Sequence, residues 1–268
     1  MKKSVVISLA ALMMAAVPAA AVSAADLTFT TGGEQGTYYA FGNVLAGKVT
    51  DATDTAVTAI TSGGSQANID ALEYGEDAQL GFVQGDVMSY AYEGSDRFED
   101  GYQVNTFSTV AALYMEQVQI VTCNPDIKTV EDLAGKNVSI GAPGSGVYFN
   151  AVDILGAYGL TEDDIKPTYE SFGDSAESLQ DGKIDAAFVT AGAPTTAVTS
   201  LGTAKDVYLV SLDDEHIDAL IADCPYYTKN VIAADTYGME EDATTVAVSA
   251  VVVAYDEVSE DDVYNFIS

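Results

Sequence analysis

Four short turns rich in glycine and small polar residues are the best candidates for binding chemistry in this chain. Each falls between an expected strand and an expected helix, and they run over residues 30–39, 62–68, 84–86 and 141–146. Open α/β sheets bind ligands at such turns, because glycine lets a ligand approach the backbone and helix N-termini offer unpaired N–H groups to an anion. One turn alone would indicate only a tight turn with a polar cap. Four at corresponding positions predict a ligand cleft.

Other motifs give weaker signals. Residues 42–49 nearly match the phosphate-binding G-x-x-x-x-G-K-[ST] loop, but Val49 replaces the hydroxyl that would hold Mg²⁺, and no strand precedes the segment. The single histidine, His216, and the two cysteines, Cys123 and Cys224, leave almost no material for a zinc site. Neither cysteine carries a nucleophile signature. We therefore expect no catalytic residue, no metal site and no cofactor.

The composition narrows the range of partners. The chain has 268 residues, of which 41 are acidic and 10 basic, giving a net charge of -31. Nothing in such a chain can replace the counterions of a nucleic acid, and an anionic membrane surface is disfavoured for the same reason. The hydrophobic share of 48% is ample for a packed core, which excludes a disordered acidic protein.

The first 24 residues are expected to be a secretory signal peptide. Lys2 and Lys3 precede an apolar run over residues 5–17, and small residues lead to a cleavage site after Ala24. The run is too short to span a bilayer, and the alternative is a buried N-terminal helix. The mature chain is then periplasmic or otherwise extracytoplasmic. Export permits a disulfide between Cys123 and Cys224, and two small buried thiols are the alternative.

Short apolar runs alternate with helical patterns along the mature chain. Strands are expected at 27–30, 56–61, 80–83, 106–115, 118–122, 137–141, 184–189, 207–211 and 246–254. Helices are expected at 37–49, 66–74, 129–132, 147–158, 195–201, 213–222 and from 259 onward. This alternation predicts an α/β fold of βαβ units on mostly parallel sheets with both faces covered. Because the last helix ends barely two turns after its cap, the C-terminus is expected to be truncated.

Five segments carry a family resemblance. They read TTGGEQGTYYAFGNVLA, SGGSQANIDAL, GFVQGD, TVEDLAGKNVSIGAPGSGVYFNA and LQDGKIDAAFVTAGAPTTAV. Together they resemble the TAXI family of TRAP-transporter solute receptors over essentially the whole mature chain. The resemblance implies a two-lobed fold of the periplasmic binding protein type II class with a ligand cleft between the lobes. It also implies a receptor that delivers a small organic acid to TRAP membrane permease subunits driven by an ion gradient. Family members continue well beyond residue 268.

The lobes and the site follow from this reading. Lobe 1 is predicted to hold residues 26–118 plus 244–268 and lobe 2 residues 119–243, with a hinge near 117–122. The only arginine, Arg97, lies in an acidic loop, so neutral donors are expected to hold a carboxylate. The predicted ligand-binding residues are Gly33, Tyr38, Tyr39, Ser65, Asn68, Gln84, Gly144, Ser145, Gly146 and Thr190.

Three functional readings remain open at this point. The first is a monomeric receptor for glutamate, glutamine or a dicarboxylate that serves a TRAP transporter. The second is a type II binding protein of an ABC-type importer that takes an uncharged or cationic nutrient. The third is an exported enzyme on the same scaffold. The sequence does not identify the ligand or the coupling ion.

Overall fold

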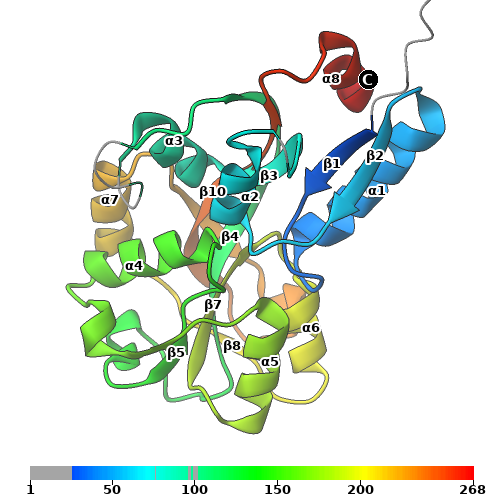
Figure 1. Ribbon diagram of the computed structural model, residues 1–268. Helices are drawn as coiled ribbons and strands as arrows, with labels where there is room; N and C mark the ends of the chain where they lie inside the picture. Colours follow the sequence, from blue (N-terminus) through cyan, green and yellow to red (C-terminus); the bar gives the residue numbers. More distant parts are fainter. Residues whose placement is uncertain (1–25, 76, 96–97, 99–101) are drawn as a thin grey trace, which may run out of the picture.

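The computed structural model describes residues 26–75, 77–95, 98 and 102–268. The predicted signal peptide and Arg97 lie outside these residues. The described part is an α/β fold in which helices pack against one sheet of ten strands. Figure 1 shows β1, β2 and α1 on one side and β5, α4, α5 and α6 on the other, with β4 and β10 between them.

The strand order is β2-β1-β3-β10-β4-β7-β5-β6, with β8 paired to β4 and β9 to β10. The outer strands pair in parallel on both sides, as βαβ units predict. The central strands are antiparallel, so the expectation of a mostly parallel sheet was wrong there. The cause is that β4 and β10 carry the chain between the two halves of the sheet in opposite directions. The strand bounds are β1 Asp26–Thr30, β2 Ala56–Ile60, β3 Leu80–Gln84, β4 Phe107–Thr122, β5 Asn137–Ser139, β6 Lys166–Thr168, β7 Ala186–Ala191, β8 Tyr208–Leu209, β9 Thr228–Ile232 and β10 Ala243–Tyr255.

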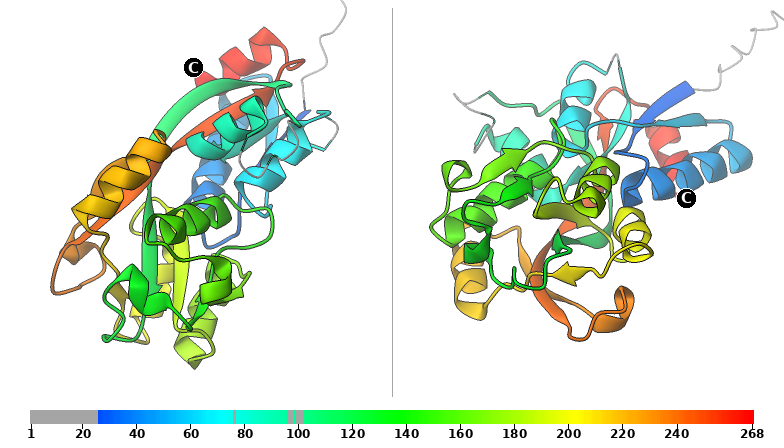
Figure 2. Two further views of the ribbon diagram at one scale, coloured as in Figure 1. Left: turned by 90° about the vertical axis from the view of Figure 1, so that its left-hand side faces the viewer. Right: turned by 90° about the horizontal axis from the view of Figure 1, so that it is seen from below.

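β4 and β10 are long strands shared by both halves of the sheet (Figure 2). Residues 107–117 of β4 pair with β10, and residues 117–122 pair with β7. The two extended runs expected at 106–115 and 118–122 are therefore one continuous strand. Glu116 and Gln117, which separate those runs in the sequence, lie where β4 passes from one half of the sheet to the other.

Eight α-helices pack against this sheet in the described part of the chain. Their bounds are α1 Thr37–Ala52, α2 Ser65–Leu72, α3 Gly85–Glu93, α4 Val147–Ala157, α5 Phe172–Asp181, α6 Thr196–Gly202, α7 Asp214–Asp223 and α8 Glu260–Ile267. Short 3₁₀ turns lie at Val130–Leu133, Glu162–Asp164 and Ala234–Thr236. α3, α5, β6 and β9 were not expected from the sequence.

Helices bury both faces of the sheet along most of β10 and at the end of β4, as predicted, whereas residues 108–115 of β4 are half-buried or exposed. On β10, Ala250 and Val252 pack into a cluster with α1 and α8, whereas Val251 and Val253 pack into another with α2 and α3. In the second half of the sheet, Ile120 and Phe188 lie in the cluster under α4 and α7. Their neighbours Val121 and Val189 lie in the cluster under α5 and α6. This alternation is what a two-sided sheet requires.

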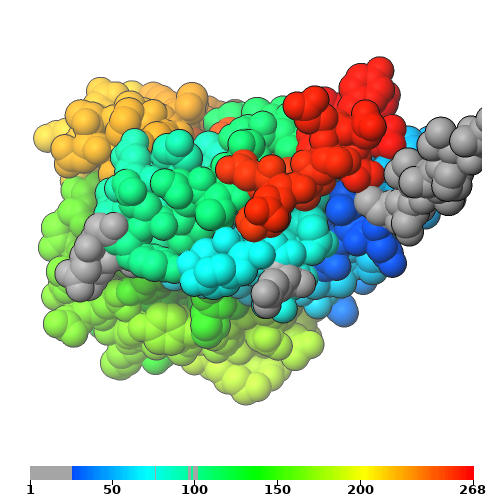
Figure 3. All heavy atoms as spheres, turned by 45° about the horizontal axis from the view of Figure 1, so that its top comes forward, coloured from blue at the N-terminus to red at the C-terminus, as the bar shows by residue number. Residues whose placement is uncertain are grey.

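The C-terminal helix α8 packs against the N-terminal part of the chain. Its Phe266 ring meets Phe29 of β1 edge to face, with centroids 5.3 Å apart. Asp262 accepts a hydrogen bond from Thr55 at 2.6 Å. Figure 3 shows this C-terminal segment on the surface beside the first residues of the fold.

Two further features bear on the sequence expectations. No helix within the described ranges is long and apolar enough to cross a membrane. No disulfide joins Cys123 to Cys224, and both residues are half-buried. The reading of these two residues as thiols is therefore the one that the structure supports.

Candidate ligand-binding site

One pocket lies where the glycine-rich turns of the two halves of the sheet meet. Its volume is about 560 Å³, counting the open mouth. The first half contributes the turns before α1 and α2 and the end of β3, and the second half contributes the starts of α4 and α5 and the end of β7. β4 contributes Glu116 between them. The lining residues are Gly32, Gly33, Gly36, Thr37, Tyr38, Ser62, Gly63, Gly64, Ser65, Gln84, Glu116, Ala142, Ser145, Gly146, Val147, Ser171, Phe172, Thr190 and Ala191.

Three of the helices that begin at this pocket have glycine at the N-cap. Gly36, Gly64 and Gly146 precede α1, α2 and α4, and no side chain caps any of the three. The fourth helix that begins at the pocket, α5, is capped by the Ser171 side chain, as α7 and α8 are capped by Asp213 and Ser259. First-turn N–H groups that no side chain or backbone carbonyl occupies can donate to a ligand, and the helix dipole favours an anion there.

The two turns that open α2 and α4 touch each other. The backbone N–H of Ala67 donates to the carbonyl of Gly144 at 2.9 Å. A Cβ at Gly63 would lie 2.5 Å from the carbonyl oxygen of Pro143, and Gly64 has a φ of +121°, which side chains rarely adopt. Glycine is therefore required here, because the two backbones approach within van der Waals contact. In this conformation the pocket is closed on that side.

A buried carboxyl group forms part of the pocket wall. Glu116 is 2% exposed, and its Oε2 accepts a hydrogen bond from the Tyr38 hydroxyl at 2.6 Å. Burial raises the pKa of Glu116 to about 8, and the negative field of Asp86 adds to this effect while the bond from Tyr38 opposes it. Burial also raises the pKa of Tyr38. Near pH 7 a proton therefore sits on Glu116 unless a bound group lowers its pKa.

A buried amide connects the pocket wall to the core. Asn150 of α4 is fully buried, and its Oδ1 accepts hydrogen bonds at 2.8 Å from both Gln84 and Thr190. Its Nδ2 donates at 2.8 Å to Asp86 and to Tyr227. Burial raises the pKa of Asp86 to about 7, although hydrogen bonds from the Val87 backbone and from Asn150 oppose this. All four hydrogen-bonding positions of the Asn150 amide are thus occupied by side chains.

One pocket hydroxyl lacks a partner. Ser145 is 6% exposed and lines the pocket, and its Oγ makes no hydrogen bond within the described residues. A buried hydroxyl without a partner costs free energy, so such a group indicates an atom that a ligand would satisfy.

The structure brings seven of the ten predicted site residues to the pocket wall. These are Gly33, Tyr38, Ser65, Gln84, Ser145, Gly146 and Thr190. Their binding of a ligand remains a prediction.

The other three predicted residues lie outside the lining. Tyr39 is half-buried on α1, and Gly144 packs against Ala67 instead of facing the hollow. Asn68 is fully buried beneath the turns, where its Nδ2 donates at 2.7 Å to the carbonyls of Thr31 and Phe82. Asn68 therefore holds two backbone segments together.

Sequence reasoning missed Glu116 and Asn150. Glu116 was detectable in principle, because it is an isolated acid inside a long apolar segment that had to be buried. Asn150 gives no comparable signal, since its importance depends on side chains from three other elements. No lysine, arginine or histidine lines the pocket within the part of the chain that the structure describes.

Comparison with known proteins places this geometry in a family. The chain is 14% identical to MatC from Rhodopseudomonas palustris with bound malate, with a TM-score of 0.60 over 90% of this chain and 81% of that one. It is 15% identical to a solved periplasmic transporter, with a TM-score of 0.59 over 92% of this chain and 82% of that one. It is 12% identical to an arginine-specific periplasmic binding protein from Salmonella typhimurium, with a TM-score of 0.51 over 91% and 90% of the two chains.

These likenesses show the fold of periplasmic binding proteins. The chain spans only 66% of the length of the aliphatic sulphonate binding protein SsuA from Escherichia coli and of its counterpart from Xanthomonas axonopodis. The sequence profile of the NMT1-like family matches residues 29–268, nearly all of the described chain. The protein therefore belongs to the NMT1-like family.

Proposed function

We propose that this protein is an extracytoplasmic solute receptor that binds a small organic acid and delivers it to a membrane permease. The observation that carries this proposal is the pocket itself. It is lined from both halves of the sheet, three uncapped helix N-termini open onto it, and the buried Ser145 hydroxyl on its wall has no partner within the described residues. Such a site binds a carboxylate through neutral donors, without an arginine.

The receptor closes as two lobes. Lobe 1 comprises residues 26–118 plus 244–268, and lobe 2 comprises residues 119–243. β4 and β10 pass between them, and the hinge lies at residues 117–122 of β4, where pairing changes from β10 to β7. A ligand that touches both lobes shifts the population towards the closed form in proportion to its differential affinity.

The transport partner is a TRAP permease driven by an ion gradient. The resemblance to TAXI receptors in five segments supports this assignment. The alternative is an ABC-type importer, and it is favoured by the likeness to the ligand-binding component of an ABC-type import system from Staphylococcus aureus, with a TM-score of 0.54. The neighbouring genes discriminate, since an ATPase gene accompanies only the second system. In both cases the receptor acts as a monomer with no catalytic residue.

Native mass spectrometry of freshly purified protein tests the proposal. We expect a retained small organic acid, such as glutamate, glutamine or a dicarboxylate, and a saturable thermal shift when the same compound is added. Ser145→Leu should abolish that shift while leaving the fold intact, because the side chain fills the pocket at the start of α4. An undiminished shift in Ser145→Leu would exclude this pocket as the site. Chemical turnover of the bound compound would favour an enzyme.

A further inference from the structure

One part of the pocket wall offers hydrogen-bond acceptors. Glu116 Oε2 is occupied by the Tyr38 hydroxyl, whereas Oε1 receives no hydrogen bond from the described residues. Among the described residues, no basic side chain lines the pocket to balance this carboxyl group. In its ionised form this buried carboxyl group would have only one donor, so a donor or a positive charge from the bound molecule would stabilise that form.

The hydrogen bonds of Asn150 determine which atoms of Gln84 and Thr190 remain available as acceptors on the same wall. Because its Nδ2 faces the acceptor oxygens of Asp86 and Tyr227, its Oδ1 must face Gln84 and Thr190. The Gln84 Nε2 therefore donates to Asn150 and Asp86, and the Gln84 Oε1 remains available as an acceptor in the pocket. The Thr190 hydroxyl donates its proton to Asn150, so the Thr190 oxygen can act only as an acceptor towards a ligand.

The donors of the pocket lie directly beside these acceptors. A Cβ placed on Gly146, at the start of α4, would lie 2.1 Å from Gln84 Oε1 and 2.9 Å from Ser65 Oγ. Ser65 is the first residue of α2, so two open helix N-termini adjoin the acceptor wall. A ligand that fills both parts must carry a positive donor group and a carboxylate close together. An α-amino acid carries both on one carbon atom.

We propose that the ligand is a zwitterionic amino acid whose ammonium group is bound by Glu116, Gln84 and Thr190 and whose carboxylate is bound at the N-termini of α2 and α4. Glu116 is then the residue that separates amino acids from dicarboxylates of the same size. This inference rests on the proposed receptor function and narrows its ligand class.

Binding of matched pairs of compounds tests the inference. The probes are the common L-amino acids, together with glutarate and succinate, which are glutamate and aspartate without the ammonium group. Titration calorimetry at neutral pH should find an amino acid that binds at least about tenfold more tightly than its partner without the ammonium group. In Glu116→Gln the affinity for that amino acid should fall by about tenfold to a hundredfold, and the preference over its partner should shrink.

Glu162→Gln is the matched control. Glu162 also accepts a tyrosine hydroxyl at 2.6 Å, from Tyr148, but it does not line the pocket. The affinity of Glu162→Gln should equal that of the wild type. Circular dichroism establishes whether Glu116→Gln is folded. If it is not, the inference is tested by the ratio of the wild-type affinities for the amino acid and for its partner without the ammonium group.

The possible outcomes separate the two proposals. If a dicarboxylate binds more tightly than every amino acid, or if Glu116→Gln leaves the preference unchanged, the inference is overturned while the receptor function stands. If no acid of either kind binds and native mass spectrometry finds a non-acidic nutrient, the proposed organic-acid receptor falls, and the inference falls with it.

Discussion

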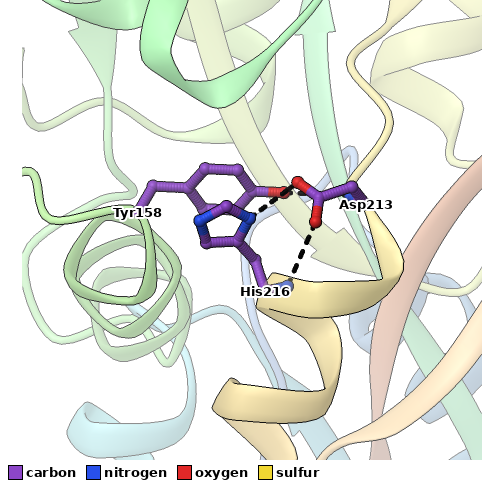
Figure 4. A network of polar contacts seen from close by, with 3 residues as sticks. All are labelled: Tyr158, Asp213 and His216. Atoms are coloured by element: carbon purple, nitrogen blue, oxygen red, sulfur yellow. Dashed lines mark hydrogen bonds and ion pairs between the residues drawn. The ribbon is translucent and has the colours of Figure 1, made fainter.

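Two clusters in this molecule each combine an acid with a tyrosine hydroxyl, and they behave in opposite ways. Glu116 lies buried in the pocket wall with one hydrogen-bond donor, Tyr38. Asp213 lies at the start of α7 on the surface, beside Tyr158 and His216 (Figure 4). Its carboxylate accepts hydrogen bonds from the His216 backbone N–H at 3.1 Å and from the Tyr158 hydroxyl at 2.9 Å. The His216 ring Nδ1 lies 2.7 Å from the same carboxylate.

The surroundings of the two acids explain the difference. Burial is the largest single influence on the pKa of Asp213 and raises it, but the backbone and ring groups of His216 and the Tyr158 hydroxyl together outweigh burial and lower the pKa to about 2. Burial raises the pKa of Glu116 to about 8, because its single donor does not replace water. Asp213 is thus a satisfied helix cap with a structural role. Glu116 has a single donor, the Tyr38 hydroxyl, and is the acid that we propose to bind the ligand.

The largest expected effect is a loss of ligand affinity when the residue at the start of α4 is changed. Gly146→Ala places a Cβ 2.1 Å from Gln84 Oε1, and the Gln84 amide cannot move without losing its bond to Asn150. Ligand affinity should fall by about a hundredfold. Titration calorimetry with the retained ligand measures the loss.

Gly156→Ala is the control within the same helix. A Cβ at Gly156 meets nothing within 4 Å, so this change should leave affinity unaltered and raise the free energy of unfolding by about 0.5–1 kcal/mol. Equal affinities in the two alanine variants would mean that the start of α4 is not part of the site.

The next effect concerns the pH dependence of stability in the ligand-free protein. The folded-state pKa values of Glu116 and Asp86, about 8 and about 7, lie above their ordinary values of 4.5 and 3.8. The folded state therefore binds more protons between about pH 4 and pH 8, and the free energy of unfolding falls as the pH rises through this range. Urea unfolding should show that the fall is smaller in Glu116→Gln, by about 1–3 kcal/mol. Parallel profiles for the two proteins would contradict the raised pKa of Glu116 in the folded state.

A smaller effect is expected at the other cluster. Asp213→Ala removes the cap of α7, which should lower the free energy of unfolding by about 1 kcal/mol and leave ligand affinity unchanged. The sign of the pH effect is reversed here, because the lowered pKa of Asp213 stabilises the fold above pH 3.8 and this contribution is lost as the pH falls through about 2. Acid titration followed by circular dichroism measures it. A change in ligand affinity in Asp213→Ala would break the distinction between the two clusters.

The smallest effect separates the hydrogen bond from the charge at Asp213. Asp213→Asn keeps an acceptor for the N–H of His216 but removes the charge that complements the helix dipole. The expected loss is only about 0.3–1 kcal/mol, measured by urea unfolding against the alanine variant. A loss as large as in Asp213→Ala would assign the stabilisation to the charge alone.

The residues around the pocket show what the sequence can and cannot predict. The turns before α1, α2 and α4 were predictable, because glycine and small polar residues mark the junction of a strand and a helix. Whether a polar side chain at such a junction faces the ligand or the core was not. Asn68 was predicted to bind the ligand, which stays a prediction; its Nδ2 donates to the carbonyls of Thr31 and Phe82, and its Oδ1 has no partner among the described residues.

Elements with few apolar residues were not predicted from the sequence. α5 has only Phe172, Ala176 and Leu179 as apolar residues among ten, so its helical period is weak. The antiparallel centre of the sheet depends on where β4 and β10 cross between the halves, and no local pattern encodes that. Glu116 lies at this crossing, which is why two separate strands were expected around it.

The most direct test of the account is the number of protons exchanged when the ligand binds. Titration calorimetry of the wild type with its best amino acid, at pH 7 in two buffers of different ionisation enthalpy, gives that number. Because burial holds the pKa of Glu116 at about 8 in the empty site, an ammonium group bound to it should expel nearly one proton, and Glu116→Gln should expel much less, since only Asp86 remains to release one. No proton release, or a net uptake, in the wild type would contradict the claim that Glu116 awaits the positive group of the ligand.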